Sequence, residues 1–145
     1  MTLNDMVTLL GGHTVGVNHC SFFQNRLSSF NGGNTDPTMD PSLDASLVEL
    51  CGSSSNLASK NPSTFLDQDT GNVFDNQFFN QVLSKKGVLH IDQKLAVDRS
   101  SARIVSNFAR NGDAFQRSFA NAMIKMGNLQ GGSNGEIRKN CRAFN

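Results

Sequence analysis

Apolar residues along the chain recur mostly three or four positions apart, and short polar stretches separate these runs. This spacing is typical of amphipathic helices. The first run predicts a helix from Leu3 to Leu10. Thr2 and Asp5 stand at its start with the spacing of a capping box, and Gly11 is a natural stop.

Two further helices are predicted in the first half of the chain. One runs from Cys20 to Leu27, ahead of a polar, glycine-containing loop from Ser28 to Pro37. The next opens at Asp40-Pro41, where aspartate is the N-cap and proline takes the first helical position. Its apolar stripe consists of Leu43, Leu47 and Leu50. The polar stretch 52–63 is predicted to be a surface loop.

The second half of the chain predicts three more helices. The first follows Asp75 and stops near Gly87; the second is capped by Asp98 and ends at Asn111-Gly112; the third is capped by Asp113 and stops at Gly127. Their stripes are interpreted as core and not as cofactor-binding surfaces: Phe78, Phe79, Val82 and Leu83; Ile104, Val105 and Phe108; Phe115, Phe119, Ala122, Met123 and Met126. With a loop at 130–135 and neither repeat nor linker, the pattern predicts one all-α domain.

Bulk properties exclude several classes of partner. The chain has 145 residues, enough for one domain that buries roughly 68–70% of its unfolded surface. Net charge is +1 and charged residues make up 17%, so no basic face is available for nucleic acid. The apolar runs are far shorter than the roughly 18 residues that span a bilayer. The first residues also lack the basic and apolar regions of a signal peptide. We expect no nucleic-acid or membrane partner.

The first candidate site is His13, in the run Leu10-Gly11-Gly12-His13-Thr14 at the end of the first predicted helix. A neutral imidazole binds transition metals, and a carboxylate that accepts its other N–H fixes the tautomer and gives the ring anionic character. A metal-binding His13 would therefore need an acidic partner. The residues alone also allow a structural histidine with satisfied hydrogen bonds.

The second candidate site is the acidic segment 66–75. Carboxylates at Asp67 and Asp75, with Thr70 between them, offer hard oxygen ligands of the kind that calcium prefers. An EF-hand does not fit, because the glycine falls one position early and Phe78 stands where a bidentate glutamate is required. A solvated acidic turn is the alternative that composition leaves open. A zinc hydrolase is a weak third reading, since His-Glu-x-x-His and paired Cys-x-x-Cys motifs are absent.

Several segments in order along the chain resemble one known family. They are DMVTLLGGHTVGVNHC at 5–20, DPTM at 36–39, FDN at 74–76, KGVLHIDQ at 86–93, MGN at 126–128 and GEIRKNC at 135–141. Together they cover essentially the whole chain and resemble the class III plant haem peroxidases, secretory enzymes that oxidise phenols with hydrogen peroxide. The resemblance implies the proximal, C-terminal half of the haem-peroxidase fold over residues 1–145, with the distal N-terminal half absent.

The resemblance also implies roles for individual residues. His13 is expected to be the axial ligand of haem b iron, Asp92 to accept its other N–H, and Phe22 to lie near the exposed haem edge. The segment at 66–75 matches the family's proximal calcium loop, whose ligands map onto Thr14 (hydroxyl and carbonyl), Asp67, Thr70, the carbonyl of Val73, and Asp75. Because Thr14 follows His13 directly, calcium would hold the haem ligand in place.

The three cysteines are an odd number. The resemblance implies a Cys20–Cys51 disulfide, which fits an oxidising, secretory compartment and would stabilise the fold by roughly 3–4 kcal/mol. In the family, the cysteine matched by Cys141 pairs with the N-terminal half, so Cys141 is expected to be a free thiol. We therefore expect a secreted protein, monomeric if complete.

Two functions compete at this point. The first is a haem peroxidase with hydrogen peroxide as oxidant and phenols as donors. The second is a truncated, non-catalytic chain that binds calcium or haem weakly and tends to aggregate through its uncovered core face. The family's distal histidine and arginine lie in the N-terminal half. His19 and His90 are expected to be surface or haem-edge residues and not their substitutes.

Overall fold

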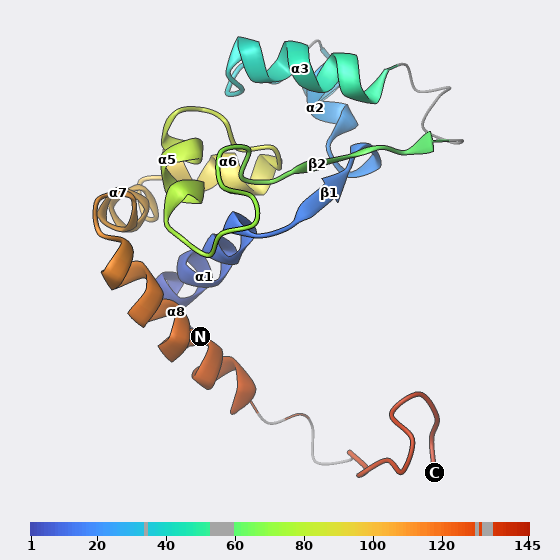
Figure 1. Ribbon diagram of the computed structural model, residues 1–145, viewed down its shortest axis with the longest axis vertical. Coiled ribbons are helices and arrows are strands. Elements are labelled where there is room, and N and C mark those ends of the chain that lie inside the picture. Colours follow the sequence, from blue (N-terminus) through green and yellow to red (C-terminus); the bar gives the residue numbers. More distant parts are fainter. Residues whose placement is uncertain (34, 53–59, 130, 132–134) are drawn as a thin grey trace.

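Helices form two groups that a short antiparallel ribbon joins (Figure 1). In the computed structural model, which describes residues 1–33, 35–52, 60–129, 131 and 135–145, α2 and α3 lie at one end. The other helices form the second group. The α-helices are α1 (Leu3–Leu10), α2 (Gln24–Ser28), α3 (Pro41–Cys51), α5 (Gln77–Leu83), α6 (His90–Val97), α7 (Ala102–Arg110) and α8 (Gly112–Gly127). The 3-10 turns are η1 (Gly11–Thr14), η2 (Cys20–Phe22) and η3 (Phe30–Gly32).

Local capping sets the start of two helices as predicted. At α1 the Thr2 backbone N–H donates to the Asp5 carboxylate at 2.8 Å, and the Asp5 N–H donates to the Thr2 hydroxyl at 3.2 Å. At α3 the Asp40 carboxylate accepts the first backbone N–H groups, and Pro41 occupies the first turn. These bonds, reciprocal at α1 and one-way at α3, satisfy amide groups that a helix start leaves without intrahelical partners.

The second predicted helix is wrong in its bounds. Residues Cys20–Phe22 form the 3-10 turn η2, and α2 is a separate short helix that begins at Gln24. The backbone changes direction at Phe23, whose φ and ψ of −134° and 2° are not helical. The predicted loop 28–37 contains the turn η3, and its residue 34 lies outside the described residues.

The all-α prediction holds for the helices, but it missed a two-stranded sheet. Strands β1 (Val17–His19) and β2 (Ser63–Phe65) pair antiparallel with Val17 opposite Phe65. The predicted surface loop 52–63 therefore ends inside a strand, and its residues 53–59 lie outside the described residues. The ribbon brings the end of the His13 turn next to the acidic segment.

The second half of the chain differs from prediction at several helix ends. Helix α6 was not predicted, and α5 ends at Leu83, before Gly87. The N-cap residue of α7 is Ser101, because Asp98 follows α6 and accepts the Ser100 N–H.

The last helix also starts earlier than predicted. Helix α8 is capped by Asn111, whose side chain accepts the Ala114 N–H, while Asp113 lies in its first turn. The predicted loop at 130–135 falls mostly outside the described residues.

Two hydrophobic clusters form the core. The disulfide cluster contains Cys20, Phe23, Leu27, Met39, Leu43, Leu47, Cys51, Leu66 and Val88. The phenylalanine cluster contains Val7, Phe78, Phe79, Val82, Leu95, Val105, Phe108 and Phe115. Some positions assigned to core stripes are in fact 42–43% exposed, namely Leu50, Leu83, Met123 and Met126.

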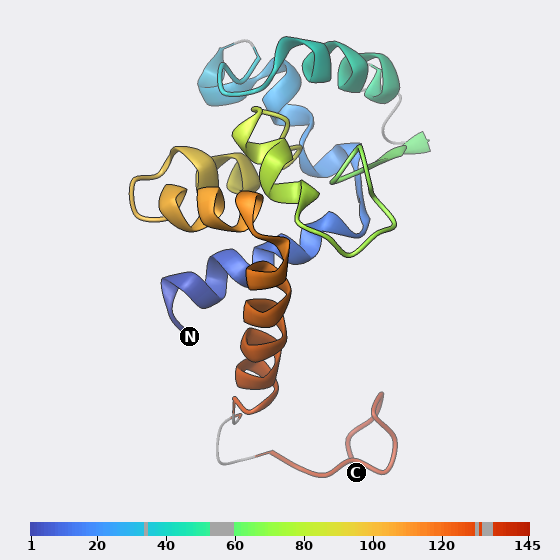
Figure 2. The same ribbon diagram turned by 60° about the vertical axis from the view of Figure 1, so that its left-hand side comes forward.

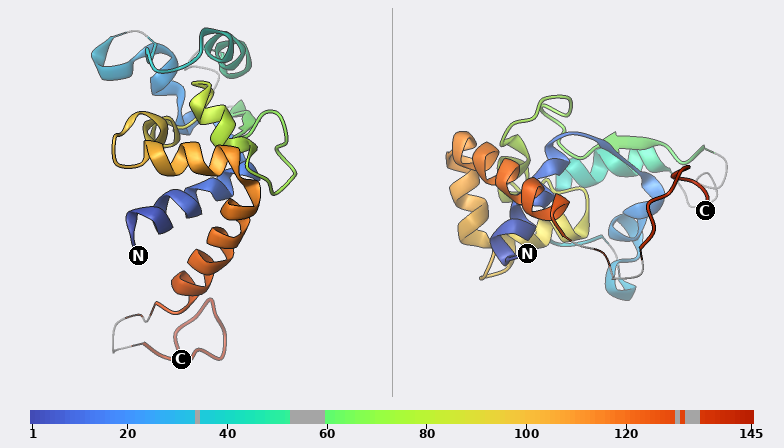
Figure 3. Two further views of the ribbon diagram at one scale, coloured as in Figure 1. Left: turned by 90° about the vertical axis from the view of Figure 1, so that its left-hand side faces the viewer. Right: turned by 90° about the horizontal axis from the view of Figure 1, so that it is seen from below.

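Helix α8 crosses α1 and extends away from the rest of the second group (Figures 1 and 2). The last described residues lie beyond the far end of α8, apart from the other helices, as the left view of Figure 3 shows, and none of them belongs to either cluster. Among the described residues, no helix combines the length and apolar character that crossing a bilayer requires.

Candidate functional site

His13 lies in the 3-10 turn η1 that continues α1. Its Nδ1 is 3.0 Å from one carboxylate oxygen of Asp92 and 3.1 Å from the other. The Asp92 side chain is 1% exposed and the His13 side chain 32% exposed. Because a carboxylate accepts a proton here, Nδ1 is assigned as the N–H nitrogen, which leaves Nε2 as a potential ligand atom.

The pair has the electrostatics of a polarised imidazole. The hydrogen bond that His13 donates to the Asp92 carboxylate raises the pKa of His13, against the opposite effect of partial burial. Burial raises the pKa of Asp92, and the hydrogen bond with His13 opposes that rise. Each partner therefore stabilises the charged form of the other.

Aromatic rings support the turn that presents His13. The Phe78 ring contacts the His13 ring edge-on, with centroids 6.0 Å apart. A Cβ atom added at Gly11 would lie 2.6 Å from the rings of both Phe79 and Phe115. The backbone at Gly11 thus packs directly on the phenylalanine cluster, and a side chain there would push the turn away.

A group of oxygen atoms surrounds Thr14, the residue after His13. Its hydroxyl oxygen is 3.2 Å from a carboxylate oxygen of Asp67, 3.2 Å from one of Asp75 and 3.5 Å from the Val73 carbonyl. The Thr70 hydroxyl lies 3.2 Å from the same two carboxylate oxygens. Thr14 and Asp67 are fully buried. The structure therefore brings together oxygens from all five predicted calcium-loop residues.

The missed β-ribbon explains this convergence. Val17 pairs with Phe65, three residues after Thr14 and two before Asp67. Beyond the ribbon, the Leu66 N–H donates to the Gly16 carbonyl at 3.1 Å, so the two segments stay side by side. Long-range pairing thus places a threonine hydroxyl among carboxylates that are more than fifty residues away in sequence.

The donor types fit a hard cation. Calcium takes six to eight oxygen ligands from carboxylates, carbonyls, hydroxyls and water. Two carboxylates that each lie 3.2 Å from one hydroxyl repel each other, and a cation between them would offset that repulsion. Among the described residues no three His, Cys, Asp or Glu side chains come together as a metal site, so a cation here would rely on the hydroxyl and carbonyl oxygens beside the two carboxylates.

The structure places His19, His90 and Phe22 on other elements than His13. His19 is on β1, and its Nδ1 is 2.8 Å from the Asn61 carbonyl. His90 begins α6, and its ring packs edge-on against Phe30 with centroids 5.0 Å apart. Phe22 is 71% exposed at the end of η2.

The cysteines pair as predicted from the resemblance. Cys20 and Cys51 form a disulfide with Cα atoms 5.7 Å apart, and it links η2 to the end of α3. Cys141 is exposed and free within the described part of the chain.

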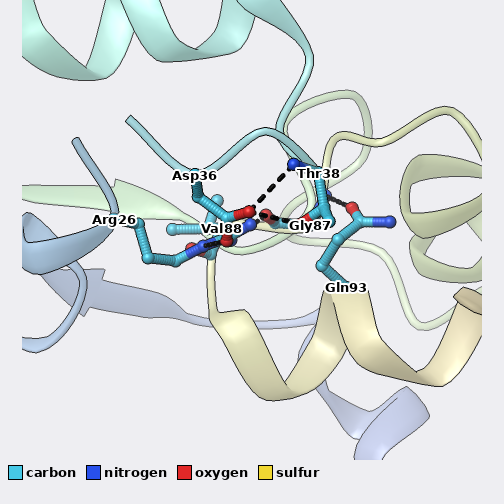
Figure 4. A network of polar contacts seen from close by, with 6 residues as sticks. All are labelled: Arg26, Asp36, Thr38, Gly87, Val88 and Gln93. Carbon is cyan, nitrogen blue, oxygen red and sulfur yellow. Dashed lines mark hydrogen bonds and ion pairs between the residues drawn. The ribbon is translucent and has the colours of Figure 1, made fainter. Parts of the chain in front are cut away.

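Sequence reasoning missed a buried polar network next to the site. Arg26 is fully buried and forms an ion pair with Asp36 at 2.9 Å. The Arg26 Nη1 donates to the backbone carbonyls of Gly87 and Val88 at 2.6 and 2.7 Å, and Gln93 accepts the Gly87 N–H (Figure 4). The available signal was an arginine between Phe23 and Leu27 on the apolar face of a short helix.

An open apolar hollow of about 490 Å³ lies beside α1, α6 and the end of α8. Its lining consists of Met1, Met6, Leu9, Leu10, Ile91, Met126 and Leu129. Leu10 and Ile91 come shortly before His13 and Asp92 in the chain. An apolar surface of this kind can bury a flat hydrophobic cofactor or another apolar face.

Comparison with known proteins agrees with this geometry. A sequence model of the peroxidase family matches residues 1–111. Peroxidase 44 and Peroxidase 57 of Arabidopsis thaliana are each 47% identical over 148 aligned positions that include the whole of this chain. The chain spans only 44% and 45% of their respective lengths. Peroxidase 28 of the same plant is 44% identical over 151 positions. The chain therefore belongs to the peroxidase family, as a member of the class III plant group that its own motifs resemble.

Proposed function

We propose that residues 1–145 form the proximal side of a haem peroxidase domain, with His13 as the axial ligand of the haem iron. The observation that carries the proposal is the hydrogen bond of His13 to the buried Asp92, at 3.0 and 3.1 Å. A carboxylate in this place fixes the ring, leaves Nε2 free and increases the electron density that imidazole donates.

Haem b would supply the iron that accepts electrons from phenolic donors and passes them to hydrogen peroxide. The residues of this chain would hold and tune it. His13 would ligate, Asp92 would keep the Nδ1 proton shared, and Phe78 would limit rotation of the imidazole through its edge-on contact. The exposed ring of Phe22 is available to cofactor or to an aromatic donor.

Haemin titration tests the ligand. With His13 in place, we expect a saturable shift of the Soret band at one haemin per chain, and His13→Ala should remove it. His19→Ala is the matched control, since His19 is bonded to Asn61 on the β-ribbon and not to the site. Equal titration curves for the wild type and His13→Ala would rule out this assignment.

A second function is a chain that binds cofactor without turnover. It is favoured by the places of the other two histidines: His19 Nδ1 is bonded to the Asn61 carbonyl on the β-ribbon, and His90 begins α6, the helix that also carries the proximal partner Asp92. Guaiacol oxidation with hydrogen peroxide separates the two. Haemin binding without turnover supports the second function. A robust rate that survives His19→Ala and His90→Ala supports the first and shows that neither histidine moves the peroxide proton.

We further propose that calcium binds among Thr14, Asp67, Thr70, Val73 and Asp75. The support is the convergence of their oxygens within 3.2–3.5 Å of the Thr14 hydroxyl or of the same two carboxylates. Bound calcium would neutralise the carboxylates and hold the turn that carries His13.

Calcium-dependent stability tests this site. At a free concentration of a hundred times Kd, one bound ion should stabilise the fold by about 2.7 kcal/mol. Asp75→Asn should remove most of this gain. Asp69→Asn is the matched control, because Asp69 is exposed in the same loop and its carboxylate pairs with Gln77. The site is wrong if both variants keep the wild-type response to calcium.

The disulfide and the plant relatives support secretion of the protein to an oxidising compartment such as the cell wall or vacuole. We propose hydrogen peroxide and small phenolic donors as its partners, and a monomeric state for the complete protein. Without a covering surface, the apolar hollow beside α1 is the part most prone to self-association.

A further inference from the structure

Asp92 reaches His13 from the first turn of α6, so the position of that helix start decides whether the two side chains meet. No side-chain cap holds this start, since its N-cap residue is Leu89. The backbone before it, Gly87-Val88, is instead held by side chains from elsewhere in the fold. The position of the Gly87-Val88 backbone therefore determines where the Asp92 side chain lies.

Two buried side chains hold the Gly87-Val88 backbone in place. Arg26 donates to the carbonyls of Gly87 and Val88 at 2.6 and 2.7 Å. Gln93 accepts the Gly87 N–H at 3.0 Å and donates to the Val82 carbonyl at 2.9 Å. Figure 4 shows the Gly87-Val88 backbone between Arg26 and Gln93. Both backbone hydrogen-bonding groups of Gly87 are thus satisfied by side chains.

The guanidinium is itself oriented by a second set of contacts. Asp36 accepts from Arg26 Nε at 2.9 Å and from the backbone N–H and hydroxyl of Thr38 at 2.9 and 2.7 Å. The Asp36 N–H also donates to the Arg26 carbonyl at 2.7 Å. The planar fork of arginine lets one end pair with a carboxylate while the other end binds carbonyls, which a lysine ammonium cannot reproduce.

Stability alone is a weak reason for this arrangement. A buried ion pair contributes little net free energy, because desolvation of both charges offsets most of their attraction. What a fixed fork does provide is one defined geometry between the segments that it joins. Arg26 joins α2 to the backbone just before α6.

We infer that Arg26 is a positioning residue for the His13–Asp92 pair: it fixes the Gly87-Val88 backbone and thereby sets where Asp92 meets the imidazole. The functional importance of this role rests on the proposed haem site. The role itself concerns a hydrogen bond within this chain and can be measured without haem.

The test is the His13 Nδ1 proton, followed by nitrogen-15 NMR of the full chain. In Arg26→Lys, which keeps the charge and loses the fork, we expect this proton to exchange with water at least roughly tenfold faster and the Nδ1 resonance to shift. Lys125→Ala is the matched control. It breaks the Asp5–Lys125 ion pair at the other end of α1 and should leave the His13 signal unchanged, even though it also removes a salt bridge.

A second variant covers the case in which Arg26→Lys does not fold. Thr38→Val removes only the hydroxyl that orients Asp36, and it should produce a smaller change in the His13 signal in the same direction. If Arg26→Lys folds with wild-type His13 exchange, the inference is overturned. If it does not fold and Thr38→Val leaves the signal unchanged, the inference is overturned as well. Haemin binding by His13 is measured separately, so its failure would count against the proposed function alone.

Discussion

The two hydrophobic clusters are held together by different means. The disulfide cluster is mostly aliphatic and contains the Cys20–Cys51 bond. The buried Arg26–Asp36 pair lies beside it, since Arg26 bonds to the carbonyl of Val88 in this cluster. The phenylalanine cluster relies on ring packing, with centroids of neighbouring rings 5.0–5.7 Å apart. His13 rests on the phenylalanine cluster. The backbone before the Asp92 helix is held from both regions, by Arg26 beside the disulfide cluster and by Gln93, which bonds to Val82 of the phenylalanine cluster. The candidate haem ligand therefore depends on one region and its partner on both.

Removal of a central ring should have the largest effect. Phe79 is fully buried and contacts the rings of Phe78, Phe108 and Phe115. Phe79→Ala is expected to lower the free energy of unfolding by about 3–5 kcal/mol through lost burial and a residual cavity. Urea unfolding measures this change. Ile124→Ala on α8, where the side chain is 64% exposed, should stay within about 0.5 kcal/mol. Equal losses in the two variants would mean that the ring cluster is not the main support of this region.

The disulfide should come next and should act on the other region. The bond closes a segment with a sequence separation of 31, for which chain entropy predicts roughly 3–4 kcal/mol of stabilisation. A Cys20→Ala, Cys51→Ala double variant should lose that amount. Hydrogen exchange should then rise mainly in α3 and little in α8. Cys141→Ser, which changes an exposed free thiol, is the control and should have no effect. A uniform rise over both helices would show that the two clusters unfold as one unit.

Crowding of the contact between the His13 turn and the rings should have an intermediate effect. In Gly11→Ala the new methyl group would lie 2.6 Å from both Phe79 and Phe115. Overpacking of this kind costs about 1–3 kcal/mol. Gly127→Ala is the matched control, because no atom beyond its chain neighbours and the nearby backbone of its own helix lies within 4 Å of its added Cβ, and it should be neutral or slightly stabilising. Thermal unfolding compares the two. A neutral Gly11→Ala would show that the rings yield easily and that the turn is not firmly seated.

How far the sequence could predict each region follows from how local its determinants are. Helices α1 and α3 were predictable because their caps, Thr2 with Asp5 and Asp40 with Pro41, lie within the same few residues. The β-ribbon and α6 were missed because long-range contacts maintain them. The ribbon pairs three-residue strands that are more than forty positions apart, and α6 begins without a side-chain cap.

The candidate site also has a part that local sequence predicts and a part that depends on long-range contacts. Residues at 67–75 show an oxygen-rich segment by themselves, but Thr14 joins it only through the ribbon. The partner of His13 lies 79 positions away, and it was predicted from the family resemblance and not from spacing. Arg26 gave no local signal beyond a charge on an apolar face. Side chains that fix a distant backbone segment become visible only once the fold is known.

The smallest effect should come from the ion pair that fastens α8 to α1 at the exposed edge of the phenylalanine cluster. Lys125 Nζ is 2.9 Å from Asp5, and the lysine side chain is 55% exposed. The backbone hydrogen bond from Thr2, followed by the contact with Lys125, lowers the pKa of Asp5 to about 2. An unfolded aspartate titrates near pH 3.9, so the folded state binds this proton less tightly. The stabilisation of the folded state by the Asp5 carboxylate is thus fully present above about pH 4 and is lost as the pH falls towards 2.

Urea unfolding between pH 5 and 2 measures this effect. Asp5→Asn should reduce the loss of unfolding free energy over this pH range. Salt at 1 M should also reduce the part of it that comes from the ion pair with Lys125. An unchanged slope in Asp5→Asn would assign the acid sensitivity to the other region instead, where Asp36 has a lowered pKa because its bonds with Thr38 and Arg26 outweigh the effect of burial.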